Sequence, residues 1–472
     1  MKSRRLRRSS EALAVLTAAS VLAACSGGGS TGSMTPPITN SSNATLTGSR
    51  FLQSTASNTL VDAPFYYVAN PPTRLAVASE GPAAIPPPSV CVRAYGLACY
   101  TPKEIRSAYD VPAAFDGTGQ TIVIVDAYGS PTIQHDLQVF DKQFGLPDPK
   151  FNIIYPTGQP VLDQSSASIR SWESETSLDV EWAHAIAPGA TVDLLVAPTN
   201  QSTDLNAAEQ YAVDNHLGNV MSLSFGAPEQ SIPGKGNNKH LKHSDDVFAQ
   251  AQEAKIAVFA SAGDTGATNG LSSPVPLFPS SDPLVTAVGG TNLFISDAGA
   301  YQKETVWNDT DPSLCPFGCQ DGAFGATGGA PSLIFAAPSY QRMLTHQKER
   351  TTADVGYDAS VYTAVLVYES FAGPGFYFVG GTSSGSPQWA GIAALADQAA
   401  GQSLGFLNNR LYKIAKHGGY GSAFHDVTIG QNGLFGGPGF PAAQGYDIPT
   451  GLGTPDVTNL INALTHTDDS VE

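Results

Sequence analysis

QTIVIVD, residues 120–126, is a run of apolar and β-branched residues that follows a Gly-Thr-Gly turn. Such a run is typical of a strand that is buried on both faces. Further along the chain, strand-like runs alternate with segments of helical spacing. The strand-like runs are 191–197, 220–224 and 256–260, and the helical segments are 133–144, 204–215 and 245–254. This alternation predicts an α/β fold with a mostly parallel central sheet and helices on both faces.

The amino terminus has the pattern of an export signal. MKSRRLRR at 1–8 is basic, 12–24 is mostly apolar, and Leu-Ala-Ala-Cys ends at Cys25. The apolar run is too short to span a bilayer as a mature helix, and the last four residues resemble the lipobox of bacterial lipoproteins. We therefore expect a signal peptide over 1–24 and a lipid on Cys25 as the only membrane attachment, at the cell envelope or cell surface. An ordinary secretory signal that contains a cysteine, with an extracellular product, is the alternative.

Composition divides the rest of the chain. Residues 25–37 have the Gly/Ser-rich composition of a flexible tether. Residues 38–99 are rich in Ser, Thr, Asn and Pro and have few periodic apolar positions, which predicts a poorly structured N-terminal extension. The α/β pattern occupies 100–464, and 465–472 form a polar tail that we expect to be disordered.

The charge balance excludes one class of partner. The chain has 24 Lys and Arg against 41 Asp and Glu, a formal net charge of -17. Nucleic-acid binding requires a basic patch, so DNA and RNA are not expected as partners. With 42% hydrophobic residues the chain can bury a large core.

Apart from Cys25, the cysteines form two close pairs, Cys91/Cys99 and Cys315/Cys319. In an exported protein such pairs predict two local disulfides. A zinc site is the alternative, but the long gap between the pairs and the lack of histidines at ligand spacing count against it.

A candidate nucleophile lies in GGTSSGSP, residues 380–387, which precedes an apolar helix at 388–399. Glycines permit a tight turn, and proline suits the first helical turn because its φ is fixed. This arrangement puts Ser383 at a helix N-terminus, where the helix dipole favours a developing oxyanion. By composition alone, a Gly/Ser loop is also an ordinary structural element.

A serine nucleophile needs a base, which is a histidine in most serine hydrolases. None of the nine histidines stands in a His-Gly-Thr sequence that opens a helix, and His184 is followed by Ala-Ile-Ala-Pro. The sequence offers instead Glu175 and Asp179, two carboxylates at i and i+4 on one helix face. Like charges at this spacing destabilise a helix by roughly 0.2–0.5 kcal/mol. The pair is therefore either a solvated face or a functional dyad.

A third carboxylate, Asp264, lies in SAGDTG at 261–266, directly after the strand-like run 256–260. Ligands of α/β sheets bind beyond the carboxyl ends of the strands, which makes Asp264 a further candidate. Gly-Asp-Thr-Gly is also an ordinary turn sequence.

Together these motifs resemble those of the sedolisins, or serine-carboxyl peptidases, whose fold is subtilisin-like. E-x-x-x-D at 175–179, S-x-G-D-x-G at 261–266 and G-T-S-x-x-x-P at 381–387 occur in the order that the family shows. The similarity extends over 100–464 and includes GGAPSLIF at 328–335. It implies a subtilisin-like α/β fold, polypeptide substrates and one structural calcium ion. A packed sheet with one calcium in turn suggests a monomer.

The resemblance assigns a role to each candidate. Ser383 is the nucleophile, Glu175 is its general base, Asp179 orients and supports Glu175, and Asp264 is the acid of the oxyanion hole. A Glu accepts the serine proton only when ionised, whereas a carboxyl donates to an oxyanion only when protonated. Both conditions hold in acid or where the site separates the pKa values. We expect peptide-bond hydrolysis through an acyl-enzyme, fastest well below neutral pH.

The resemblance also implies one structural Ca²⁺ near the C-terminus. Asp426 and Asp447 contribute side chains, and Val427, Ala443 and Gly445 contribute main-chain carbonyls, the hard oxygen ligands that Ca²⁺ requires. Ala443 replaces a usual glycine, so its carbonyl joins only if its backbone dihedrals allow it. Without the resemblance, this Gly-rich stretch is interpreted as a plain loop.

Two positions depart from the family pattern. Asp126 matches an acidic position on the first strand that is usually Glu, and Phe225 stands where Trp is frequent. Phenylalanine keeps the aromatic surface but lacks the indole N–H, so extension of the network through these two residues stays open. The stretch between Cys25 and residue 100 is also shorter than the usual pro-domain, which leaves a vestigial pro-segment or none.

Two other functions compete with an exported acid endopeptidase. One is a non-catalytic sedolisin-like binding or adhesion module, and the other is a Ser-His hydrolase. A non-catalytic module would not need the carboxylate pair Glu175 and Asp179, which destabilises its helix. A Ser-His hydrolase would need a histidine motif that the sequence lacks.

Overall fold

The computed structural model describes residues 60–68, 74–75, 84–232, 239–314, 325–371 and 373–468. The chain clusters into two units, Met1–Asn43 and Ala44–Glu472, and only the second contains described residues. The predicted signal peptide, Cys25, the tether and the Cys315/Cys319 pair lie outside the described residues. None of the described helices has the length and apolar character that crossing a membrane requires.

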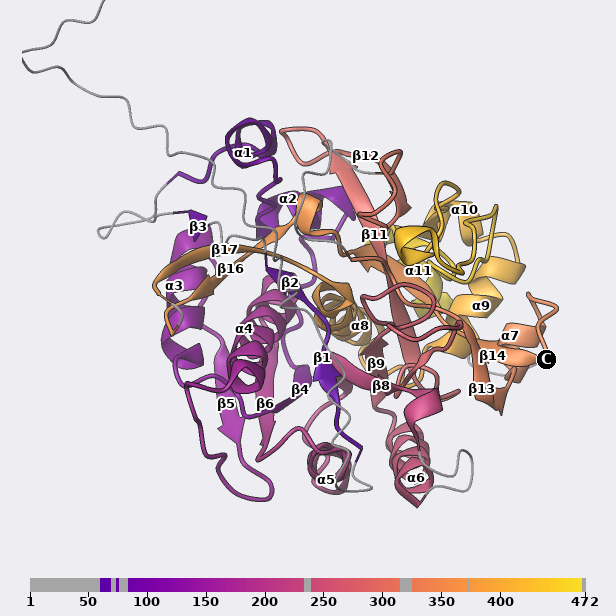
Figure 1. Cartoon of the computed structure of the whole chain (residues 1–472), viewed down its shortest axis with the longest axis horizontal. Helices are drawn as coiled ribbons and strands as arrows, with labels where there is room; N and C mark the ends of the chain where they lie inside the picture. The colour runs from indigo at the N-terminus through magenta and orange to yellow at the C-terminus, as the bar shows by residue number, and fades with distance from the viewer. Residues whose placement is uncertain are drawn as a thin grey trace, which may run out of the picture. The chain divides into compact units, whose positions relative to one another are not determined.

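An eight-stranded sheet organises the fold (Figure 1). Its order is β12-β11-β9-β7-β4-β6-β5, and β15 also pairs with β11. The strands are β4 Thr121–Ala127, β5 Lys150–Ile154, β6 Thr191–Ala197, β7 Val220–Leu223, β9 Ala257–Ser261, β11 Thr286–Ile295, β12 Tyr301–Val306 and β15 Val355–Asp358. Neighbouring strands are parallel except β11 and β12, which are antiparallel. The predicted α/β fold with a mostly parallel sheet is confirmed.

Strand β4 shows why the sheet needs cover on both faces. Ile122 and Ile124 belong to one core cluster, whereas Val123 and Val125 belong to a second cluster on the opposite face. Successive side chains of a strand point to opposite faces, so an unbroken β-branched run supplies both cores. Each fully buried side chain of this size contributes roughly 1.5–3 kcal/mol.

Helices contribute to each of the two clusters. Helices α3, α4 and α8 pack in the cluster of Ile122, and α5 and α6 pack in the cluster of Val123. The helices are α1 Pro88–Tyr95, α2 Pro102–Ala108, α3 Ile133–Phe144, α4 Ala167–Ile186, α5 Ser202–Asp214, α6 Lys239–Glu253, α7 Ser339–Arg342, α8 Gly385–Ala400, α9 Asn408–Lys416, α10 Tyr420–Ala423 and α11 Val457–His466. Because α11 continues to His466, the predicted start of the tail at 465 is two residues too early.

Shorter strands surround the central sheet. They are β1 Ala63–Pro64, β2 Tyr67–Val68, β3 Arg74–Leu75, β8 Phe225–Pro228, β10 Leu277–Phe278, β13 Pro331–Ala336, β14 Glu349–Thr351, β16 Val365–Glu369, β17 Gly375–Gly380, β18 Phe424–His425 and β19 Thr454–Pro455. Of these, β1 and β10 flank β8, whereas β16, β2 and β3 pair with β17.

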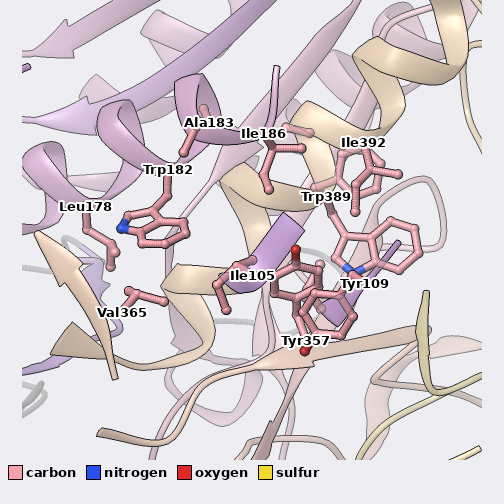
Figure 2. Packing of buried hydrophobic residues seen from close by; sticks show 14 of the residues in the cluster. Ile105, Tyr109, Leu178, Trp182, Ala183, Ile186, Tyr357, Val365, Trp389 and Ile392 are labelled. Atoms are coloured by element: carbon pink, nitrogen blue, oxygen red, sulfur yellow. The ribbon is translucent and has the colours of Figure 1, made fainter. Parts of the chain in front are cut away.

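Helices α4 and α8 are fixed to one another by close packing (Figure 2). A Cβ on Gly391 would lie 2.8 Å from Cβ of Ile186, so only glycine allows the two helices to approach this closely. The indole N–H of Trp182 donates to the carbonyl of Leu366 at 3.1 Å, and that of Trp389 donates to Gly356 at 3.0 Å. Helix α4 carries Glu175, and α8 begins directly after the turn Thr382–Ser384 that contains Ser383, so the packing sets the distance between the two side chains.

The described part of the N-terminal extension, residues 60–68, 74–75 and 84–99, is more ordered than we predicted. Residues 63–64 and 67–68 form strands, 88–95 form a helix, and Phe65, Tyr66 and Tyr67 are buried. No periodic signal marks the two strands because each is only two residues long. The predicted disulfide between Cys91 and Cys99 is present, with a Cα–Cα distance of 6.0 Å.

Candidate active site

Ser383 lies where strand β17 turns into helix α8. The turn passes through Gly381, whose φ of 117° suits glycine, and through the 3-10 turn Thr382–Ser384. The Ser383 side chain is fully buried, and its hydroxyl donates to the main-chain oxygen of Ser224 at 3.3 Å. Ser383 is also close enough to Glu175 to lower the pKa of that carboxyl, although neither carboxylate oxygen of Glu175 has a hydrogen-bond partner among the described residues.

Helix α4 brings Glu175 and Asp179 to this serine. Both side chains are fully buried, so the alternative of a solvated helix face is wrong. Asp179 accepts a hydrogen bond from the hydroxyl of Ser224 at 2.9 Å. Ser224 therefore contacts Asp179 through its side chain and Ser383 through its main chain.

The carboxyls at this site raise one another's pKa values. Burial and then the charge of Asp179 hold the pKa of Glu175 well above its usual range, whereas the contact with Ser383 opposes the rise. Burial and then Asp126 raise the pKa of Asp179, and Ser224 opposes this rise. Burial also raises the pKa of Asp126 to about 7. These three carboxyls therefore titrate as a set in which full ionisation is unfavourable.

Asp264 follows strand β9 and faces the serine loop from the other side. Its Oδ1 accepts hydrogen bonds from both the main-chain N–H and the hydroxyl of Thr382, each at 2.8 Å. The hydroxyl of Thr382 in turn accepts from the N–H of Gly263 at 3.0 Å. Oδ2 of Asp264 has no hydrogen-bond partner in the described part of the chain. Burial raises the pKa of Asp264 to about 7.

The two departures from the family pattern occupy different places. Asp126, near the end of β4, is buried, and its charge raises the pKa of Asp179. The ring of Phe225 packs against that of Trp172 of α4 with centroids 5.8 Å apart. The structure thus connects Asp126 electrostatically to the dyad, whereas Phe225 makes an apolar contact.

His184 belongs to a different part of helix α4. Its Nε2 lies 3.2 Å from Asp141 and 2.9 Å from the carbonyl of Pro147. These contacts hold the imidazole against α3 and the loop that follows it. No hydrogen bond joins a histidine to Ser383 among the described residues.

The predicted calcium residues come together in one C-terminal loop. Asp426 accepts hydrogen bonds from the hydroxyl of Tyr420 at 2.9 Å and from the N–H of Gly445. Asp447 accepts from the N–H of Ala443 at 3.1 Å. The charge of Asp426 also acts on Asp447, so the two carboxylates are close neighbours. Val427, which follows Asp426, is buried.

Sequence reasoning missed three contributors to the site. Ser224 links Asp179 to Ser383, Thr382 holds Asp264, and the main-chain oxygen of Phe65 accepts from the N–H of Ser383 at 3.1 Å. Ser224 ends the strand-like segment 220–224 and Thr382 precedes Ser383 in the serine motif, so their positions in the sequence could have indicated both. Phe65 had none.

The fold and the site together define a subtilisin-like α/β protein in which carboxyl groups surround the serine. No protein-family model matches the chain. Kumamolisin from Bacillus sp. (strain MN-32) is 32% identical over 380 residues, which are 77% of this chain and 63% of that protein. Sedolisin from Pseudomonas sp. (strain 101) is 32% identical over 373 residues, 76% of this chain and 60% of that protein.

A solved structure gives the same result. Pseudomonas sedolisin, described as a serine-carboxyl proteinase complexed with two molecules of pseudo-iodotyrostatin, matches with a TM-score of 0.68 and 30% identity. The match covers 77% of this chain and 97% of that one. The chain belongs to the sedolisin family. It spans less than two thirds of the length of the two curated relatives named above.

Proposed function

We propose that this protein is an exported peptidase that hydrolyses peptide bonds in acid, with Ser383 as nucleophile and Glu175 as general base. The observation that carries the proposal is a buried serine that faces a carboxyl dyad on one side and Asp264 on the other. Relatives named sedolisin and kumamolisin add to this support.

Glu175 takes the proton of the Ser383 hydroxyl as Oγ attacks the carbonyl carbon of a peptide bond. The N–H of Ser383 and a protonated Asp264 donate to the oxygen that becomes negative. Glu175 then gives its proton to the leaving amine, and water hydrolyses the resulting ester. Asp179 and Asp126 hold Glu175 in place and share the charge of the set.

The acid range follows from Asp264. Its pKa of about 7, raised by burial, means that it is protonated and can donate only below roughly that pH. A negative Asp264 would repel the oxyanion instead of stabilising it. Activity is therefore expected in acid and is expected to decline as pH rises through about 7.

The experiment is hydrolysis of a denatured protein at pH 3 to 9 by the wild type and by two variants. Ser383→Ala and Glu175→Gln should each lower the rate at least about 100-fold, because the nucleophile or its base is gone. Ser384→Ala is the matched control, since Ser384 contacts the side chain of Gln388 at 3.0 Å. Full activity of Ser383→Ala would disprove the proposal, and no activity in any form would favour a non-catalytic binding module.

We also propose one structural Ca²⁺ bound through the carboxylates of Asp426 and Asp447, with carbonyls of Val427, Ala443 and Gly445. Two neighbouring carboxylates that a single loop brings together are a donor set that fits a hard cation. Such an ion neutralises their mutual repulsion and stabilises the loop; it takes no part in the chemistry of Ser383.

We further propose that residues 1–24 direct export and that Cys25 carries a lipid. The support is the basic start, the apolar run and the Leu-Ala-Ala-Cys ending. Growth with a labelled fatty acid tests it: the wild type should become labelled, whereas Cys25→Ser should not.

A further inference from the structure

Residues 60–65 lie beside the candidate active site as an extended peptide between two main-chain partners. On one side, Ala63 pairs antiparallel with Gly226 of β8, and Figure 1 shows β1 beside β8. On the other side, the N–H of Asp62 donates to the carbonyl of Asn200 at 3.0 Å, and the side-chain amide of Asn200 donates to the carbonyl of Asp62 at 3.0 Å. Main-chain hydrogen bonds of this kind hold any extended polypeptide, so side-chain pockets decide which sequences fit.

The carbonyl of Phe65 fixes the register of this peptide against Ser383. Its oxygen accepts a hydrogen bond from the N–H of Ser383 at 3.1 Å, and this N–H is a donor that we propose for the oxyanion. Phe65 therefore stands where a substrate would place the residue just before the cleaved bond. Asp62, three residues earlier in the chain, marks the place of the fourth residue before that bond.

The side chain of Asp62 is 5% exposed and lies in a pocket with one polar wall. Helix α5 supplies this wall through Ser202, Asn206 and Glu209, whose i, i+4 and i+7 spacing puts them on one helix face. Apolar side chains, among them that of Phe278, also line the pocket. A mainly apolar pocket with a few placed polar groups fixes the orientation of a polar ligand group.

The contacts of Ser202 indicate that Asp62 binds as an uncharged acid. The Ser202 hydroxyl lies 2.5 Å from Oδ2 of Asp62 and 3.3 Å from the carbonyl oxygen of Leu60. A hydroxyl has one hydrogen, so it donates fully to only one of these oxygens. Both contacts are satisfied when a protonated Asp62 donates to Ser202 and Ser202 donates to Leu60.

Burial acts in the same direction on the two carboxyls of the pocket. It raises the pKa of Asp62 to about 7 and the pKa of Glu209 to about 8. The charges that act on Glu209 are those of Asp62 and Asp282, and Asp282 is in turn affected by Asp245 and Arg350. In acid both carboxyls of the pocket are therefore uncharged, and they offer no negative charge to a Lys or Arg side chain.

Two polar groups of the α5 wall have hydrogen-bonding capacity left. The side-chain nitrogen of Asn206 and Oε2 of Glu209 are buried and have no hydrogen-bond partner in the described part of the chain. An apolar side chain in the pocket would exclude water and leave these groups unpaired, which selects against such a side chain. The wall is thus better suited to an acid than to an apolar residue.

We propose that this pocket is a specificity subsite that selects an uncharged aspartic acid side chain at the fourth residue before the cleaved bond of a substrate. Its specificity-determining residues are Ser202, Asn206 and Glu209. The inference rests on the proposed function and adds a substrate class to it, namely polypeptides with Asp at this position. Another polypeptide enters the pocket only when residues 60–65 have left it.

Four quenched fluorogenic peptides test this selection with the full-length wild-type protein. They share Ala-Pro-Phe before the cleaved bond and differ only at the residue before Ala, which is Asp, Asn, Leu or Lys. At pH 3.5, kcat/KM for the Asp peptide should exceed that for the Leu and Lys peptides at least about tenfold, because the α5 wall requires a hydrogen-bonding side chain. Mass spectrometry of the products should show that the cut follows Phe.

The Asn peptide tests the charge state of the bound acid. Asn has the shape of a protonated Asp and donates at every pH, so the two peptides should have similar kcat/KM at pH 3.5. A free Asp side chain ionises near pH 3.8, whereas one in the pocket keeps its proton up to about pH 7 because burial raises its pKa. The ratio of kcat/KM for Asp to that for Asn should therefore fall at least about tenfold between pH 3.5 and pH 6.5.

Variants of α5 assign the selection to the pocket. Glu209→Leu should lower the ratio of kcat/KM for the Asp peptide to that for the Leu peptide at least about fivefold, and so should Ser202→Ala, which removes only a hydroxyl. This ratio does not depend on the fraction of enzyme that folds. Gln210→Leu is the matched control, because Gln210 contacts Asp214 at 2.7 Å and Gln250 at 3.0 Å instead of the pocket, and its ratio should equal that of the wild type.

Several results overturn the inference and can be told from failure of the proposed function. If the wild type digests a denatured protein but cuts none of the peptides after Phe, or cuts all four at equal rates, the inference fails and the proposed function stands. Preference for the Lys peptide, or a ratio of Asp to Asn that is independent of pH, contradicts selection of an uncharged acid. If neither the peptides nor the denatured protein are cut, both the inference and the proposed function fail.

Discussion

Asp179 accepts a hydrogen bond from the hydroxyl of Ser224 at 2.9 Å. The main-chain oxygen of Ser224 accepts a hydrogen bond from the hydroxyl of Ser383 at 3.3 Å. One residue on the chain between β7 and β8 therefore contacts both the supporting carboxyl and the candidate nucleophile. The Asp179 contact opposes the rise in that residue's pKa that burial and Asp126 cause, and so favours its ionised form.

Ser224→Ala should lower activity without removing it. Hydrogen bonds to charged groups contribute about 1.5–3 kcal/mol, so we expect a loss of roughly 10- to 100-fold in kcat. Because the pKa of Asp179 rises further when the donor is lost, the acid side of the pH–rate profile should move to higher pH. The measurement is kcat against pH with a denatured protein or a fluorogenic peptide.

Ser222→Ala is the matched control for this prediction. Ser222 is equally buried but contacts the hydroxyl of Ser386 at 2.9 Å instead of a carboxyl. The acid side of the pH–rate profile of Ser222→Ala should coincide with that of the wild type. An unchanged profile in Ser224→Ala would show that this hydrogen bond does not influence the dyad.

Asp264→Asn tests the alkaline limit of activity. Asn keeps an oxygen to accept from Thr382 and places an NH₂ group where Oδ2 lies, so it donates at every pH. The decline that we expect as pH rises through about 7 in the wild type should disappear or move to higher pH. The rate in acid should fall by no more than about 100-fold, the lower range for loss of one oxyanion donor.

Asp397→Asn provides the comparison for Asp264→Asn. Burial raises the pKa of Asp397, near the far end of α8, to about 7 as well, and this residue accepts from the N–H of Leu404 at 2.7 Å. An alkaline limb that moves in both variants would indicate a general effect of removing a buried carboxyl. A limb that moves in neither would contradict the role of Asp264.

Much of the fold could be predicted because it depends on local patterns. The β-branched run 120–126 specifies a strand covered on both faces. Periodicity does not mark the helix that carries Glu175 and Asp179, because its residues 172–186 are buried on every side. Burial of this dyad could not be predicted, since an i, i+4 carboxylate pair is the same on a solvated helix. It depends on Ser224 and Ser383, which are distant in sequence.

Residues 62–68 of the N-terminal extension escaped prediction for a related physical reason. Its strands are two residues long and are held by main-chain hydrogen bonds to β8 and β17, which any side chain permits. Phe65 meets Ser383 across more than 300 residues of chain. No hydrophobic period marks a segment whose partner is a cleft instead of a core.

Chelation should destabilise the protein if the C-terminal loop holds Ca²⁺. A ligand present at 100 times its Kd stabilises the folded state by about 2.7 kcal/mol, so EDTA should lower Tm by several degrees and added Ca²⁺ should restore it. Asp447→Asn should abolish this response. Asp456→Asn, which alters the N-cap of α11 through the contact with Asn459, should retain it. If EDTA left the Tm of the wild type unchanged, the proposed ion would be contradicted.

The last prediction concerns stability and the buried acid Glu209 on α5. Burial raises its pKa to about 8, and the charges of Asp62 and Asp282 add to the rise. The folded protein therefore keeps a proton that the unfolded chain loses above about 4.5. Stability from this group is complete below that pH and falls as pH rises toward about 8.

Thermal melts should reveal this slope in the Ser383→Ala variant, which lacks the proposed nucleophile. In that background Tm should be higher at pH 5 than at pH 8, and Glu209→Gln should reduce the difference because an amide does not ionise. Glu253→Gln, at an exposed end of α6, should leave the difference unchanged. Equal slopes with and without Glu209→Gln would mean that Glu209 is ionised in the folded protein.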